Sequence, residues 1–71
     1  MIAQVKIRPS ETRDVYIEDG LKMLLDGRAW MLSFNIENTL CRMIALPDGT
    51  IISSKWDNEE MAFVDMSGRK V

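Results

Sequence analysis

The chain is 71 residues long, with nine basic residues, eleven acidic residues and a formal net charge of −2. That length predicts one domain, residues 1–71, and excludes two. The acidic balance argues against general binding to the phosphate backbone of nucleic acids, which requires clustered lysine and arginine. A hydrophobic fraction of 46% is ordinary for a globular domain, so we expect the chain to fold.

The cysteine content points to a reducing compartment. Cys41 is the only cysteine, so an intrachain disulfide, the usual staple of small secreted domains, cannot form. None of the asparagines is followed by serine or threonine two residues later, so no N-glycosylation acceptor is present. No apolar stretch approaches the length that spans a bilayer. The sequence therefore predicts a cytoplasmic protein with no membrane contact.

The N-terminal segment Ile2–Arg8 alternates apolar and polar residues, which is typical of a half-buried strand that ends at Pro9. Residues 12–17 fit two structures. Alternation favours a second strand, whereas Asp14 could instead cap a helix that begins at Val15. We expect the strand.

A short amphipathic helix follows over residues 17–26. Its apolar residues fall on one stripe, formed by Ile17, Leu21, Leu24 and Leu25. Gly27 stands at the usual position just after a helix end. Gly20, inside the helix, costs roughly 0.5–1 kcal/mol relative to alanine.

The rest of the chain has the pattern of an antiparallel meander. Alternation or turn signals predict four strands, at residues 29–36, 40–46, 50–56 and 61–66. Pro47-Asp48-Gly49 is the strongest turn signal, and we expect a loose tail at residues 67–71. The predicted fold is α+β: a small antiparallel, meander-like sheet of four to five strands with one short helix packed on one face. A small, partly open barrel is the alternative.

The residue types argue against catalysis. The chain has no histidine, so the commonest general base and a major metal ligand are absent. Cys41 fits a small buried hydrophobe better than a nucleophile. The acidic cluster of Asp57, Glu59 and Glu60 lacks the spacing and glycine of a calcium loop. We therefore predict no enzyme activity, no cofactor and no metal, and interpret the cluster as a solvated turn or a contact for a basic partner.

The first functional hypothesis is a non-enzymatic protein-binding module, an inhibitor or regulator of the kind that phages and mobile elements encode. Tryptophan is enriched among binding hot spots, and exposed strand edges can pair with a partner or with a second copy. A protein partner of unknown identity and a homodimer are both expected on this basis. The candidate partner-binding residues are Trp30, Lys55, Trp56, Asp57, Glu59 and Glu60.

Two alternatives stay open. One is a nucleic-acid-binding domain that uses dispersed basic and aromatic residues, such as Lys55 beside Trp56. The other is a small-molecule or nucleotide-binding protein, in which Trp30 and Trp56 stack on a ring. Met31 and Met43, on the less apolar sides of their strands, fit either a binding surface or a sheet that is partly covered on both faces.

Overall fold

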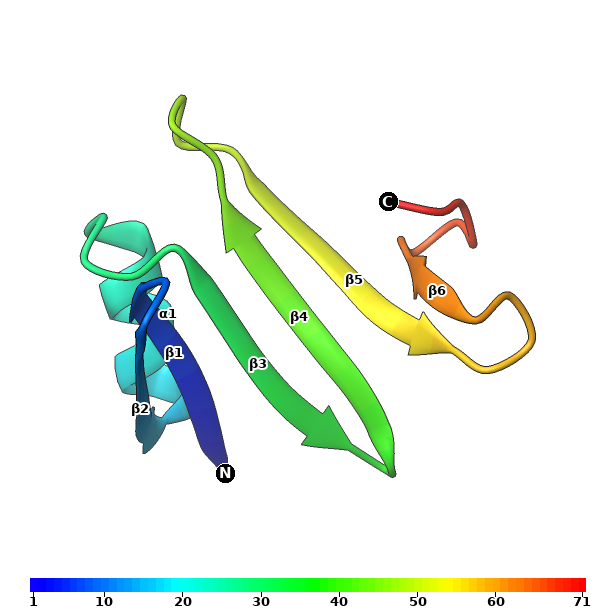
Figure 1. Cartoon of the computed structure of the whole chain (residues 1–71), viewed down its shortest axis with the longest axis horizontal. Coiled ribbons are helices and arrows are strands. Elements are labelled where there is room, and N and C mark those ends of the chain that lie inside the picture. The colour runs from blue at the N-terminus through cyan, green and yellow to red at the C-terminus, as the bar shows by residue number, and fades with distance from the viewer.

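The computed structural model describes residues 1–71 and contains one open sheet with a single helix on one of its faces (Figure 1). The elements are β1 (Ile2–Arg8), β2 (Glu11–Tyr16), α1 (Ile17–Leu25), β3 (Met31–Ile36), β4 (Thr39–Ala45), β5 (Ile51–Asp57) and β6 (Ala62–Val64). All neighbouring strands are antiparallel, in the order β2-β1-β3-β4-β5-β6. The α+β class is confirmed. The prediction of four to five strands is too low by at least one, and the sheet does not close into a barrel.

The ambiguous segment after Pro9 is a strand, and the helix follows it directly. Tyr16 is the last strand residue, with extended backbone at φ −66° and ψ 145° and no side-chain cap. The Ile17 amide donates to the carbonyl of Met1 at 3.0 Å, so the first turn of α1 is tied to the start of β1. Asp14 therefore lies within β2 and does not cap the helix.

The helix α1 packs on β1, β2, β3 and β4, and its backbone does not come near β5 or β6. Beneath it lies a core cluster of five buried residues, Ala3, Val5, Leu24, Ala29 and Leu32. Gly20 is buried against this cluster, because a Cβ atom there would lie 2.7 Å from Leu32 Cδ1. The glycine that lowers helix propensity is thus required by close helix–sheet contact.

The second half of the chain is a meander joined by tight turns. Glu37 and Asn38 connect β3 to β4 with φ values of 50° and 64°, both in the left-handed region. A two-residue hairpin loop of this kind matches the twist of the flanking strands. Gly49 (φ 91°) follows Pro47 and Asp48 in the next turn, as predicted.

The C-terminal residues return to the sheet. The amide of Asp65 donates to the carbonyl of Arg69 at 2.8 Å, and the amide of Val71 donates to the carbonyl of Phe63 at 3.1 Å. Lys70 forms an isolated antiparallel bridge with Val64. The segment 67–71, for which the sequence predicts a loose tail, thus lies beside the outer edge of β6. The single helix, α1, has neither the length nor the apolar character required to cross a membrane.

Candidate binding surface

The face of the sheet that carries α1 is covered over only part of its width. Side chains directly opposite one another on paired strands share a face, so Leu32, Met43 and Ser53 form one row on the helix side. Leu32 is fully buried, Met43 is half-buried and Ser53 is exposed. Burial falls along this row because the backbone of α1 lies close to β3 and not to β5.

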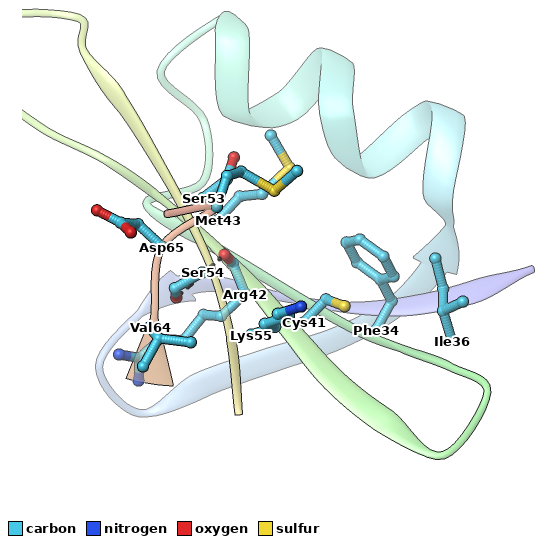
Figure 2. Close-up of a pocket in the computed structure, with 11 residues that line it drawn as sticks. Phe34, Ile36, Cys41, Arg42, Met43, Ser53, Ser54, Lys55, Val64 and Asp65 are labelled. Carbon is cyan, nitrogen blue, oxygen red and sulfur yellow. Dashed lines mark hydrogen bonds between the residues drawn. The ribbon is translucent and has the colours of Figure 1, made fainter. Parts of the chain in front are cut away.

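A hollow occupies the uncovered part of this face. It has a volume of about 210 Å³ and we call it the open hollow. Its apolar lining residues are Phe34, Ile36, Cys41, Met43, Val64 and Met66, and its polar ones are Arg42, Ser53, Ser54, Lys55 and Asp65. Figure 2 shows Phe34, Ile36 and Met43 on the side of the sheet where α1 lies, and the Arg42 side chain extending away from it.

Three charged residues line the open hollow, and two of them, Lys55 and Asp65, differ in the bonds that they form within the chain. Asp65 Oδ1 accepts hydrogen bonds from the Ser67 hydroxyl at 2.7 Å and from the amides of Ser67 and Arg69 at 2.9 and 3.0 Å. These bonds, led by that of the Ser67 side chain, lower the pKa of Asp65 below its ordinary value. The Lys55 ammonium makes no ion pair. Lys55 is therefore a charged group on the wall of the open hollow that has no ion-pair partner within the chain.

Cys41 lies on the wall of the open hollow. Its side chain is half-buried, and its Sγ lies 3.8 Å from the carbonyl of Thr39. It stands directly opposite Phe34 on the neighbouring strand. The cysteine is therefore a packing residue that still contacts solvent, close to the buried hydrophobe predicted from sequence.

The opposite face of the sheet carries no helix. Here the Arg42 guanidinium lies 3.8 Å from the ring centroid of Phe63, and Trp56 meets Phe63 edge to face at 5.3 Å and 76°. Arg42 Nε is shielded from solvent without a hydrogen-bond partner, and the side chain makes no ion pair. A cation stacked on an aromatic face is stabilised by the ring quadrupole.

Four of the residues predicted to bind a partner lie together at the loop between β5 and β6. Asp57 Oδ1 accepts from the amides of Glu59 and Glu60 at 2.8 and 3.2 Å, so this carboxylate holds the turn. Glu60 also lies 3.6 Å from the Lys70 ammonium. Trp56 donates from Nε1 to Asn58 at 3.1 Å. Much of the polar capacity of this cluster is thus used within the chain.

The other two predicted residues are separated from that cluster. Lys55 points to the opposite face from Trp56 and borders the open hollow. Trp30 lies just before β3 and is 39% exposed. The amide of Trp30 donates to the carbonyl of Lys6, and the carbonyl of Trp30 accepts from the amide of Ala45. These bonds place Trp30 at the end of the β3–β4 ladder that is opposite the turn at residues 37–38. The structure does not bring the two tryptophans together.

Sequence reasoning missed most of the apolar lining of the open hollow as a binding site. Phe34 was visible only as an alternating strand residue and Val64 only as one position of a predicted strand, whereas Met43 had two interpretations, a binding surface or a partly covered sheet face. Their proximity depends on strand register: Phe34 pairs with Cys41, Cys41 with Lys55, and Lys55 with Val64. No local pattern in the sequence carries this register.

No group of three or more histidine, cysteine, aspartate or glutamate side chains is placed to hold a metal ion. A function must be inferred from the two uncovered surfaces of the sheet. No protein-family model matches this chain, and no match is found among the curated proteins or the solved structures.

Proposed function

We propose that this chain is a small, non-enzymatic protein-binding module that acts as an inhibitor or regulator of the protein it binds. The open hollow receives an apolar side chain from that partner. The observation that supports this proposal is a hollow with apolar walls, lying over the part of the sheet that α1 leaves uncovered. A buried apolar anchor in a preformed pocket is the usual centre of a protein interface.

The size of the open hollow favours a side chain over a free ligand. Pockets for drug-sized molecules and cofactors are usually about 300–1,000 Å³. The open hollow, at about 210 Å³, is smaller than this range. Burial of one large apolar side chain contributes roughly 1.5–3 kcal/mol, which suits a single interface anchor. A small-molecule ligand is therefore less favoured at the open hollow.

The total exposed area supports the same proposal. The chain exposes 5170 Å², whereas a compact monomer of 8.2 kDa is expected to expose about 4,500 Å². The excess, on the order of 600–700 Å², is close to the ~800 Å² that each partner contributes to a standard interface. A partner that covers the open part of the sheet would bring the exposed area to that of a compact domain.

Two matched charge substitutions test the proposal. Ile36 lines the open hollow and is 44% exposed, while Leu40, 38% exposed, lies near the same hairpin turn on the opposite face. Proteins captured from cell lysate with the tagged chain are identified, purified and titrated. We expect Ile36→Glu to weaken binding at least about tenfold by placing a charge in an apolar pocket. Leu40→Glu serves as the control.

The result that overturns the proposal is a partner that binds wild type and Ile36→Glu equally. Loss of binding in both variants would place the contact elsewhere and would equally contradict it. Melting curves establish beforehand that each variant folds. Both positions are already more than one-third exposed, so neither charge needs to be buried in the core.

A second candidate, a surface for single-stranded nucleic acid, is favoured by one specific observation. Arg42, Trp56 and Phe63 form an aromatic and basic cluster on the uncovered face opposite α1. Aromatic platforms with nearby cations bind single strands through base stacking. Titration with single-stranded oligonucleotides across a salt series tests it, because phosphate contacts give a steep salt dependence. An absence of binding at low salt excludes this candidate.

A further inference from the structure

The strand β5 has an outer edge that is only partly paired. β6 pairs with its last three residues alone, in the register Lys55–Val64, Trp56–Phe63 and Asp57–Ala62. The first four residues, 51–54, pair with β4 on one side and with no strand on the other. Figure 1 shows β6 as a short strand beside only the far end of β5.

The backbone groups that face this gap follow from the ladder with β4. The amide of Leu46 donates to the carbonyl of Thr50 at 2.8 Å, so Thr50 bonds toward β4. Bonding direction alternates along an antiparallel strand, so Ile52 also bonds toward β4, while Ile51 and Ser53 point outward. No turn or side-chain hydrogen bond uses the outward groups of these two residues. Each offers a free amide and a free carbonyl.

The other strand edges are less open to a partner. The outer strand β2 carries Glu11 and Arg13, joined by an ion pair at 2.9 Å, and charged residues discourage pairing at an edge. The outer edge of β6 is occupied by Lys70 and Val71 through the Val64–Lys70 bridge and the bond from Val71 to Phe63. The free part of β5 is therefore the least protected edge.

This edge borders the open hollow. Ser53 and Lys55 belong to both β5 and the lining of the hollow, and Met43 lies directly opposite Ser53. A strand added beside residues 51–54 would project alternate side chains to the face that carries the hollow. The unpaired Lys55 ammonium lies at the end of the gap, where its charge would complement an acidic residue of the added strand.

We propose that the open edge of β5 binds an extended segment of a partner protein as an added β-strand in line with β6. Alternate apolar side chains of this segment enter the open hollow, and one carboxylate pairs with Lys55. The backbone bonds supply affinity and the hollow supplies selectivity, as in other complexes formed by strand addition. This mode of binding rests on the proposed function of the open hollow.

Amide exchange tests the added strand directly. The probe is a linear peptide selected from a displayed random library against the wild-type chain. In the free protein the amides of Ile51 and Ser53 should exchange rapidly, and those of Ile52 and Ser54, bonded to β4, slowly. Peptide binding should slow exchange at Ile51 and Ser53 by at least about tenfold, because their amides gain acceptors. Unchanged exchange at both residues in a saturated complex overturns the proposal.

Two substitutions at one position separate the backbone bond from the side chain. Ser53→Pro removes the outward amide and leaves the bonds to β4, since proline is tolerated at strand edges. Ser53→Ala removes the hydroxyl and keeps the amide. We expect Ser53→Pro to weaken the affinity for the selected peptide at least about tenfold. Ser53→Ala should change this affinity less than about threefold. Equal binding by both variants overturns strand addition.

A peptide-side control applies if Ser53→Pro does not fold. N-methylation of a peptide amide that faces β5 should abolish binding of the peptide, whereas N-methylation of an amide that faces away from β5 should be tolerated. Peptides that need Ile36 but tolerate every N-methyl group would refute strand addition while the proposed function stands. A library that yields no peptide sensitive to Ile36→Glu contradicts both. If wild type instead dimerises, and Ser53→Pro prevents this, the occupant is a second copy and the assignment to a partner is wrong.

Discussion

The two halves of this chain are built from similar strands but bury their side chains to different extents. Seven residues are buried, and six of them lie within residues 1–32: Ala3, Val5, Gly20, Leu24, Ala29 and Leu32. Val64 is the only buried residue in residues 33–71. The strands of the second half contain more apolar residues than those of the first, yet all of these except Val64 remain half-buried or exposed.

The position of one helix explains this difference. α1 follows β2 without a loop and packs on the first strands of the sheet, so the apolar residues beneath it are removed from water. The meander β4–β6 has no second helix and keeps an apolar surface. A sheet with one helix can thus be stable at one end and available for binding at the other. Three substitutions and one pH titration test that contrast, from the largest expected effect to the smallest.

Leu32→Ala should produce the largest loss of stability. Leu32 is fully buried at the centre of the core, so the substitution removes apolar contacts and leaves a cavity that costs about 2–5 kcal/mol. A chain of this length has a total stability of roughly 4–10 kcal/mol. Urea unfolding measures the change. The control is Met43→Ala, one strand away on the same face and half-buried, which should cost less. An equal loss would contradict the contrast between the halves.

Gly20→Ala should also destabilise the first half, although alanine favours helices by about 1 kcal/mol. The new Cβ would lie 2.7 Å from Leu32 Cδ1 and 3.2 Å from methyl groups of Val5 and Val15. Because Leu32 is fully buried it cannot move freely, and overpacking typically costs about 1–3 kcal/mol. The net loss should be about 1 kcal/mol and should shrink in a Leu32→Val background. A gain in melting temperature for Gly20→Ala alone would refute the close contact.

Met61→Gly should stabilise the second half. Met61 has a φ of 53° and its side chain is 70% exposed, so the residue holds a left-handed backbone with little packing in return. Relief of that conformation should contribute about 1 kcal/mol. Met61→Ala is the control, because it shortens the side chain without changing the backbone preference. Chemical denaturation of the three proteins should separate glycine from the other two, and equal stabilities would contradict the strain.

The smallest effect concerns pH and the C-terminal turn. The pKa of Asp65 is lowered by bonds from the Ser67 hydroxyl and the Arg69 amide, so its ionised form stabilises the folded turn. This contribution is complete above the ordinary pKa of 3.8 and is lost as pH falls through the lowered value. Amide shifts of Ser67 and Arg69 should titrate with a midpoint below 3.8, and this titration should disappear in Asp65→Asn. A midpoint at or above 3.8 would contradict the hydrogen bonds.

Local sequence patterns predicted most elements of this fold. Alternation over Ile2–Arg8 and residues 29–36, the apolar stripe of residues 17–26 and the Pro47-Asp48-Gly49 turn all correspond to observed structure. These signals are local because strand and helix periods depend on neighbouring residues. Residues 12–17 stayed ambiguous because no capping side chain marks the start of the helix. The start is marked instead by a tertiary hydrogen bond from the amide of Ile17 to the carbonyl of Met1.

The candidate site was much less accessible to such reasoning. Lys55 was selected for its position beside Trp56, yet it faces the open hollow on the other side of the sheet. The aromatic pair of Trp56 and Phe63, the stacked Arg42 and the free edge at Ile51 and Ser53 all depend on which strands are neighbours. Strand neighbours are fixed by contacts between residues distant in the chain.

The sequence by itself determined the periods of the strands and helix, the turn residues and the lone cysteine, because each is a property of adjacent residues. Only the tertiary structure decided which half of the sheet the helix covers and where β6 stops pairing with β5. Gly20 joins the two levels: sequence marks it as a weak helix residue, and packing against Leu32 explains why it is required. The physical reason is that burial depends on packing between elements, which a local pattern does not contain.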